Sequence, residues 1–164
     1  MAAWKLPDNG AWNCNDKEMH VMKDEERQSA ELACEKIVKQ FAVFNDLGEL
    51  EKLAALFVED GSFARPLDPE NPTIGRAEIL AMLQARPPRL SRHIMSNIVI
   101  DVLGPDEATG ISYVTFLSTT DVDAARPVAA EPKIFVGEYR DNFVRTADGW
   151  RLKSRKGNMT LIFG

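Results

Sequence analysis

Apolar residues recur at intervals of three and four in the first third of the chain, which is the spacing of one face of an α-helix. This face consists of Ala30, Ala33, Cys34, Ile37, Val38 and Phe41. Residues 45–48 interrupt the pattern, and residues 49–57 are expected to form a second, short helix. A third helix is predicted over residues 76–86, because Pro87-Pro88 follows and proline cannot continue a helix.

From residue 91 onward, apolar and polar positions alternate with a period of two, which indicates strands. Four long strands are predicted, over residues 91–103, 108–119, 133–146 and 149–162. The short segments Gly104-Pro105-Asp106 and Ala147-Asp148-Gly149 are typical of tight turns. They are therefore expected to join the first two and the last two strands as hairpins.

The segment between the second and third predicted helices is interpreted as irregular. Asp60-Gly61 is typical of a turn, residues 62–65 of a short strand, and residues 66–73, which contain three prolines, of a loop. Helices followed by a bent antiparallel sheet make an α+β fold. We expect three N-terminal helices packed on the concave face of a strongly curved, mostly antiparallel sheet, with a pocket at its open end.

Residues 1–22 contain Pro7 and Gly10 but show neither helical nor strand periodicity. We interpret them as an N-terminal arm, in which Trp4 and Trp12 are the residues that would dock it. A single domain is predicted over residues 23–164, because a chain of 164 residues is long enough to bury one core.

Composition narrows the class of protein. A formal net charge of −5 argues against a nucleic-acid-binding surface. The N-terminus lacks a basic segment followed by an apolar run, and no stretch is long enough to cross a membrane. Cys14 and Cys34 do not have the spacing of metal ligands. We therefore expect a cytoplasmic protein without a metal site.

Histidine is scarce in this chain: His20 lies in the predicted arm, and His93 lies near the start of the first long strand. A neutral imidazole accepts protons well at physiological pH, and a carboxylate on its other ring nitrogen fixes the tautomer. Asp46, at the end of the first predicted helix, is the candidate carboxylate. If the two side chains meet, His93 is a general base and Asp46 is its orienting acid.

Both residues also have a purely structural interpretation. Asp46, with Glu49 three positions later, matches the signal that begins a helix, in which the acid caps free backbone N–H groups. A histidine in a strand is often a hydrogen-bonded structural residue. The residues alone leave both interpretations open.

The order of the elements and the segment from Phe41 to Phe63 resemble the nuclear-transport-factor-2-like superfamily, and within it the SnoaL-like branch. The matching motifs are an Asp after the first helix, Phe57-Val58-Glu59-Asp60-Gly61, a His four residues before an Asn (His93 and Asn97), and Asp148-Gly149-Trp150. The resemblance spans residues 25–163. This branch includes hexachlorocyclohexane dehydrochlorinase, scytalone dehydratase and bile-acid dehydratase, in which the matching Asp and His are the catalytic pair. The resemblance therefore implies a cone-shaped domain in which Asp46 and His93 are the catalytic residues.

Strand parity and the resemblance suggest further pocket residues. Phe63 and Arg65 share one face of the short strand, and Arg65 stands where related dehydratases carry a tyrosine. Arg65 could bind a substrate carboxylate or phenolate, or it could pair with Glu138 or Asp46 as part of the scaffold. Phe116 matches a position that lines the pocket of the dehydrochlorinase.

Glu138 stands where the dehydrochlorinase carries an arginine that assists halide loss, so the resemblance argues against dehydrochlorination here. Glu138 could act as a second acid–base group if burial raises its pKa. It could also form an ion pair with Arg140, Arg145 or Arg65, as most charged strand residues do.

Asn97 shares a side with His93 by strand parity and could bind substrate. Alternatively it closes a bulge, because the apolar alternation changes face after it. Phe41 is interpreted as core or pocket wall.

Two classes of function follow. The first is a cofactor-independent lyase (dehydratase) or isomerase that abstracts a proton from a small, largely apolar cyclic or aromatic substrate. The alternative is a non-catalytic ligand-binding or scaffold protein that resembles the β subunit of ring-hydroxylating dioxygenases. An enzyme should enclose an apolar cavity where the Asp and His converge, whereas a scaffold should have a large apolar contact surface and no such pair. A homodimer or homotrimer is expected in either class, because the open sheet face needs a cover.

Overall fold

The computed structural model of the protein describes residues 22–164, so the predicted arm lies outside the described residues except for Met22. Helix α1 spans Asp24–Leu47, and Gly48 ends it with a left-handed φ of 71° that glycine adopts without strain. The stripe predicted from the sequence is buried, apart from the partly exposed Ala33. The buried residues of α1 are Ala30, Cys34, Ile37, Val38, Phe41 and Ala42.

Two short helices follow, α2 (Leu50–Ala54) and α3 (Arg76–Gln84). They contact each other, and α3 also contacts the strand that follows α2; Leu53 of α2 and Ile79 of α3 are fully buried. Helix α3 ends before the predicted end at residue 86. Arg86 precedes Pro87, and the ring of a proline disfavours the helical conformation in the residue before it.

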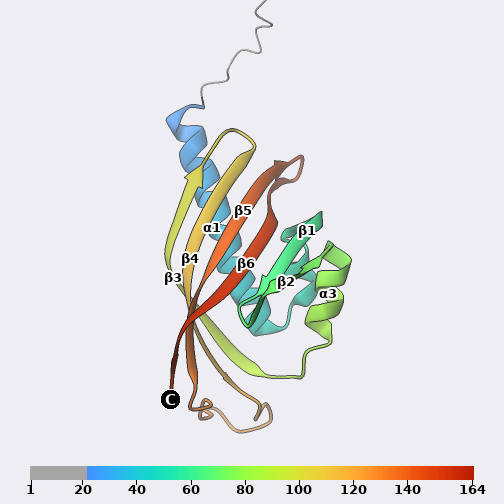
Figure 1. Cartoon of the computed structure of the whole chain (residues 1–164), viewed down its shortest axis with the longest axis vertical. Helices are drawn as coiled ribbons and strands as arrows, with labels where there is room; N and C mark the ends of the chain where they lie inside the picture. The colour runs from blue at the N-terminus through green and yellow to red at the C-terminus, as the bar shows by residue number, and fades with distance from the viewer. Residues whose placement is uncertain (1–21) are drawn as a thin grey trace, which may run out of the picture.

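One curved sheet of six strands, in the order β2-β1-β6-β5-β4-β3, forms the rest of the domain (Figure 1). The strands are β1 (Phe57–Arg65), β2 (Asp68–Ile74), β3 (Leu90–Val102), β4 (Glu107–Thr119), β5 (Ile134–Thr146) and β6 (Gly149–Phe163). Strands β1 and β6 are parallel, and all other pairs are antiparallel. The long strands begin and end within one residue of their predicted ends, and the α+β class is confirmed. Helix α1 covers one face of the sheet, behind the strands in Figure 1.

The predicted turn at Asp60-Gly61 and the predicted loop over residues 66–73 are wrong. Asp60-Gly61 lies inside β1, where the register with β6 shifts between Phe57 and Ser62. A bulge of this kind accommodates Gly61, whose missing Cβ would lie only 3.0 Å from the Val58 carbonyl oxygen. The proline-rich segment forms β2, which pairs only with β1. Prolines are tolerated there because an edge strand needs backbone N–H groups on one side only.

Strand β3 carries the bulge predicted near Asn97. Asn97 has a positive φ of 47°, and the pairing with β4 shifts between Ser96 and Val99. Before the bulge, the partly buried residues are His93 and Met95. After the bulge, they are Ile98 and Ile100. The extra residue thus moves the apolar side of β3 from odd to even positions.

The core lies between α1 and the concave face of the sheet. The Phe41 ring packs edge-on against Phe57 and Phe63, with ring centroids 6.3 and 5.3 Å away. A buried ion pair crosses this core: Arg155 donates two hydrogen bonds of 2.8 Å to Asp141, and both side chains are 0% exposed. The guanidinium of Arg155 also lies 4.2 Å from the Phe41 ring centroid. These contacts tie α1 firmly to β5 and β6.

Candidate active site

Asp46 and His93 meet at the C-terminal end of α1. Asp46 lies in the last turn of that helix and His93 near the start of β3, and the two elements pack together. His93 Nδ1 is 2.6 Å from Asp46 Oδ1, and the two side chains are only 11% and 10% exposed. Because a carboxylate only accepts hydrogen bonds, Nδ1 carries the proton. The predicted contact between these two residues is confirmed.

Both carboxylate oxygens of Asp46 accept hydrogen bonds from residues of β3. Its Oδ2 accepts the backbone N–H of His93 at 2.8 Å, and its Oδ1 accepts the Ser91 hydroxyl at 2.8 Å. Burial alone would raise the pKa of Asp46, but the hydrogen bonds from His93 and Ser91 outweigh burial and hold it below its ordinary value. Asp46 does not begin the next helix, because the N-cap of α2 is Glu49. The helix-start interpretation of Asp46 is therefore wrong.

The other ring nitrogen of His93 faces Asn45. Asn45 Nδ2 lies 3.4 Å from His93 Nε2, and Asn45 Oδ1 accepts a 2.8 Å hydrogen bond from Arg86 Nη2. Since Arg86 can only donate, it fixes which end of the amide is oxygen and turns the NH₂ group toward the imidazole. Nε2 is then the unprotonated nitrogen of a neutral ring, which is the form that accepts a proton.

A cavity of about 640 Å³ opens beside this pair. It is bounded by the end of α1, the segment after α3, and strands β1, β3, β4 and β5. Its apolar wall includes Leu50, Phe63, Leu83, Val114, Phe116 and Phe135. The ring of Phe116 lies 4.7 Å from that of His93, centroid to centroid. A mostly apolar hollow with a few polar groups is typical of a small-molecule site.

Three of the predicted pocket residues line this cavity: Phe63, Arg65 and Phe116. The side chain of Arg65 is 49% exposed, so it is not buried. Its guanidinium lies 3.9 Å from the Asp68 carboxylate and forms no ion pair with Asp46 or Glu138. Of the two interpretations left open for Arg65, the scaffold pairing with Glu138 or Asp46 is therefore wrong.

The other three predicted pocket residues do not line it. Phe41 is 1% exposed and belongs to the core, where α1 turns it toward Phe57 and Phe63. Glu138 accepts a hydrogen bond from Arg140, as its ion-pair interpretation predicted. Asn97 is exposed in the β3 bulge, which moves it out of the face that carries His93.

The cavity also contains polar residues that the sequence analysis did not single out. Asn45 precedes Asp46, and Arg86 and Arg89 flank the two prolines after α3. Tyr139 is 3% exposed, and burial raises its pKa to about 12, so its hydroxyl keeps its proton. The Pro87-Pro88 pair could have indicated a rigid turn that carries the arginines, but nothing in the sequence placed that turn beside His93.

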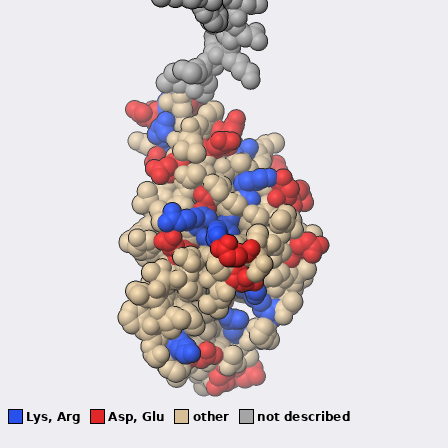
Figure 2. Space-filling model, viewed as in Figure 1, with Lys and Arg blue, Asp and Glu red and all other residues tan. Residues whose placement is uncertain are grey.

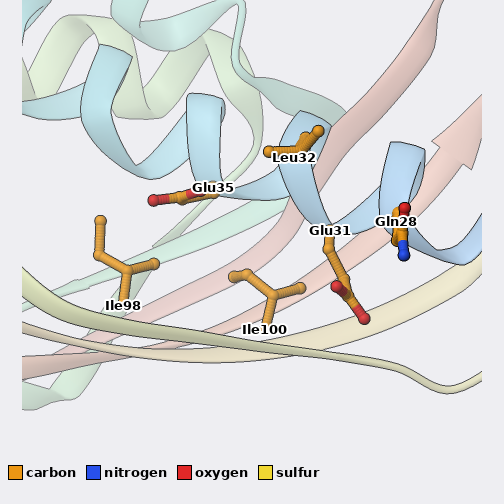
Figure 3. A pocket seen from close by; sticks show the side chains of 6 residues that line it. All are labelled: Gln28, Glu31, Leu32, Glu35, Ile98 and Ile100. Carbon is orange, nitrogen blue, oxygen red and sulfur yellow. The ribbon is translucent and has the colours of Figure 1, made fainter.

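A second hollow, of about 380 Å³, lies between α1 and β3 (Figure 3). It is lined by Gln28, Glu31, Leu32, Glu35, Ile98 and Ile100. Glu35 pairs with Lys39 at 2.7 Å, and the lining holds no histidine or cysteine. The hollow therefore has carboxylates but lacks an imidazole like that of His93 in the larger cavity.

Within residues 22–164, no group of three or more His, Cys, Asp or Glu side chains is arranged to hold a metal ion. None of the helices in this part of the chain is long and apolar enough to span a membrane.

Solved structures share this fold. A protein from Novosphingobium aromaticivorans that is proposed to be a scytalone dehydratase shares 27% identity, covering 85% of this chain and 90% of that chain, with a TM-score of 0.71. An NTF2-like protein with a cystatin-like fold from the same species shares 21% identity, covering 82% and 84%, with a TM-score of 0.66. A type 2 hexachlorocyclohexane dehydrochlorinase shares 15% identity, covering 85% and 91%, with a TM-score of 0.71.

No curated protein matches the chain. The nuclear-transport-factor-2-like fold expected from the order of elements is confirmed by the helices, the curved six-stranded sheet and these structural matches. One family model, the SnoaL-like domain, matches residues 26–156. Because that match covers most of the chain, the protein belongs to the SnoaL-like domain family.

Proposed function

We propose that the protein is a cofactor-independent lyase or isomerase in which His93 abstracts a proton from a small, largely apolar cyclic or aromatic substrate. The observation that carries this proposal is the 2.6 Å contact between Asp46 and His93 Nδ1 at the wall of an apolar cavity. The contact leaves Nε2 as the basic nitrogen. A positioned general base of this kind contributes roughly 10²–10⁴-fold to a rate.

In the proposed reaction, Nε2 takes a proton from a substrate carbon that lies next to a carbonyl or a leaving group. The C–H electron pair becomes a double bond and either expels a leaving group from the neighbouring carbon or moves into the carbonyl. The imidazolium that forms is stabilised by the Asp46 carboxylate. It then returns its proton to the departing hydroxyl, which completes an elimination, or to another substrate carbon, which completes an isomerisation.

The surroundings of the pair support this chemistry over the scaffold alternative. A scaffold has no use for an acid–base pair that is about nine-tenths buried and faces a hollow of about 640 Å³. The 27% identical relative proposed to be a scytalone dehydratase adds support for a dehydratase-type reaction. Tyr139, whose hydroxyl stays protonated, supplies a hydrogen-bond donor to the same cavity.

Proton abstraction can be tested before the physiological substrate is known. Cyclic ketones and β-hydroxy ketones are incubated with the protein in D₂O, and the loss of the α-proton signal is followed by NMR. His93→Gln and Asp46→Asn should each slow the exchange about 10²-fold or more, since the first removes the base and the second its tautomer partner. Arg92→Gln is the matched control, because Arg92 is exposed and lies beside His93 but outside the cavity lining. Full exchange activity in both site variants would refute the mechanism.

A further inference from the structure

Two arginines in the cavity wall lack an acidic partner. Arg86 is partly buried, Arg89 is exposed, and neither forms an ion pair with any described residue. The hydrogen-bond partners of Arg86 are neutral: Nε donates to the Leu83 carbonyl at 3.2 Å and Nη2 to Asn45 Oδ1 at 2.8 Å. A guanidinium has five N–H donors, so Arg86 retains donors that no group within residues 22–164 accepts.

Neither Asp46, which lies behind His93, nor the carboxylates that line the cavity, Asp68 and Glu131, neutralise these arginines. Asp46 accepts hydrogen bonds from His93 and Ser91, and Asp68 lies 3.9 Å from Arg65. Glu131 is exposed and forms no ion pair with a described residue. Burial, together with the nearby charges of Arg89 and Arg65, lowers the pKa of Arg86, as expected for a cation without a counter-ion.

Arg86 is also placed with respect to the base. It holds the amide of Asn45, and that amide faces His93 Nε2, so one side chain separates the free guanidinium from the proposed proton acceptor. Phe116 completes this corner: its ring contacts the ring of His93, and the guanidinium carbon of Arg89 lies 6.0 Å from its centroid. An aromatic ring stacked near Phe116 would thus place one edge at the arginines and the other at Nε2.

We infer that the substrate of this cavity is a cyclic or aromatic carboxylate, whose anionic group binds Arg86 and Arg89 while a ring C–H faces His93 Nε2. The inference rests on the proposed function for the role of Nε2, but not for the anion site. Arginine suits this role, because its planar guanidinium binds a carboxylate through two parallel hydrogen bonds. Arg65, suggested by the sequence for this role, instead lies beside Asp68 at the cavity edge.

The test compares a carboxylate with its neutral isostere by isothermal titration calorimetry. The probes are 1-naphthoate and 1-naphthamide, which have nearly the same shape but differ in charge. The wild-type protein should bind the naphthoate at least about tenfold more tightly than the naphthamide, and Arg86→Gln should remove that preference. Arg89→Gln should reduce the preference in part. Arg92→Gln is the control with the same loss of charge outside the cavity, and it should leave both affinities unchanged.

Folding of each variant is checked by circular dichroism, and Arg86→Lys, which keeps the charge, serves if Arg86→Gln does not fold. That variant should keep a weakened preference for the naphthoate, because an ammonium binds a carboxylate through one point of contact. Equal affinity of the wild-type protein for the two probes would overturn the inference. A preference for naphthoate that persists in Arg86→Gln would also overturn the inference. If Arg86→Gln does not fold, a preference that is undiminished in both Arg86→Lys and Arg89→Gln would overturn it.

The same measurement separates this inference from the proposed function. His93→Gln lacks the base but retains both arginines, so it should keep the preference for the naphthoate over the naphthamide, whatever its absolute affinity for either probe. A wild-type protein that prefers the naphthoate but shows no proton exchange in D₂O would refute the proposed function and leave the anion site standing. Proton exchange in a wild-type protein that does not prefer the naphthoate would refute the anion site and leave the proposed function standing.

Discussion

At the scale of single residues, the two ring nitrogens of His93 are distinguished by their neighbours. Nδ1 meets a carboxylate at 2.6 Å, and Nε2 meets an amide at 3.4 Å. The first contact is short and charge-assisted, whereas the second is long and easily replaced by a substrate. The pair is therefore held firmly on the protein side and loosely on the cavity side, which is the arrangement that the proposed role of His93 as a base requires.

Asn45 offers a direct test of this asymmetry. Asn45→Asp places a carboxylate next to Nε2, and a nearby negative charge favours the protonated imidazole. A base with a raised pKa is neutral only at higher pH, so the acidic limb of the kcat/KM profile should move up by about one pH unit. Asn142→Asp, an equal change of charge at an exposed site where Asn142 bonds Ser154, should not move it. An unmoved limb in Asn45→Asp would contradict the assignment of Nε2 as the base.

Asp46 should also make stability depend on pH. Its pKa in the folded protein is lowered by the hydrogen bonds from His93 and Ser91, so its ionised form stabilises the fold. That contribution is complete above the ordinary carboxyl pKa of about 4 and is lost as the pH falls through the lower folded value. Asp46→Asn should therefore be roughly 1–3 kcal/mol less stable than wild type at pH 7, with a difference that shrinks below about pH 4. Urea unfolding from pH 7 to pH 3 measures this, and a difference independent of pH would refute it.

At the scale of elements, the site depends on where α1 stops and where β3 begins. Asp46 occupies the last turn of α1, directly before Leu47 and the left-handed Gly48 that ends the helix. The glycine lets the chain leave the helix sharply, with its N–H and that of Glu49 bonded to the carbonyls of Asn45 and Phe44. The carboxylate is thereby held at a fixed place beside β3.

Gly48→Ala should show that this helix end is a conformational requirement. A Cβ at Gly48 would meet no atom within 4 Å, so the only cost is the left-handed φ, roughly 1–2 kcal/mol. Gly104→Ala is the matched control, since Gly104 also has open space around its Cβ position but no positive φ. Chemical denaturation should report the loss in Gly48→Ala and little change in Gly104→Ala. Equal stabilities of the two variants would contradict this account.

At the scale of the whole molecule, the outer face of the sheet is only partly polar. Four residues on adjacent strands form one row across the sheet, in the order Ile94, Thr115, Val136 and Leu161. Tyr113 lies on β4, two residues before Thr115. Ile94, Tyr113 and Leu161 are 56%, 44% and 52% exposed. Figure 2 shows a tan area without charged side chains on the left of the molecule, below the middle of the view, with Lys, Arg, Asp and Glu around its lower edge. Contiguous exposed apolar surface of this kind is typical of a protein interface.

We therefore expect the homodimer or homotrimer predicted from the sequence to form through this face. Light scattering at micromolar concentration should give a mass of two or three chains for the wild-type protein. Ile94→Lys combined with Leu161→Lys should lower it, because a charge is costly to bury without a partner. Leu32→Lys, at an equally exposed apolar position on α1, is the control and should keep the assembly. A monomeric wild-type protein would refute the prediction.

Most of the fold could be predicted because periodicity is a local property. The burial of α1 follows the three-and-four spacing of its apolar residues, and the long strands follow an alternation that requires no knowledge of their partners. Strand β2 and the first half of β1 were missed for the opposite reason, whereas residues 62–65 of β1 were predicted as a strand. Their glycine and prolines are unfavourable in an isolated strand and become acceptable only at a bulge and at the edge of a sheet.

By itself the sequence determined which residues could do acid–base chemistry, since His93 is the only histidine within the predicted domain, and it determined the elements that carry them. Only the tertiary structure decided which groups meet. It brought Asp46 and His93, 47 residues apart, into contact and turned Asn45 toward Nε2 through Arg86. It left Phe41, Glu138 and Asn97 outside the cavity. The physical reason is that side-chain direction along one element is set by local backbone geometry, whereas the partner across a cavity is set by how distant elements pack.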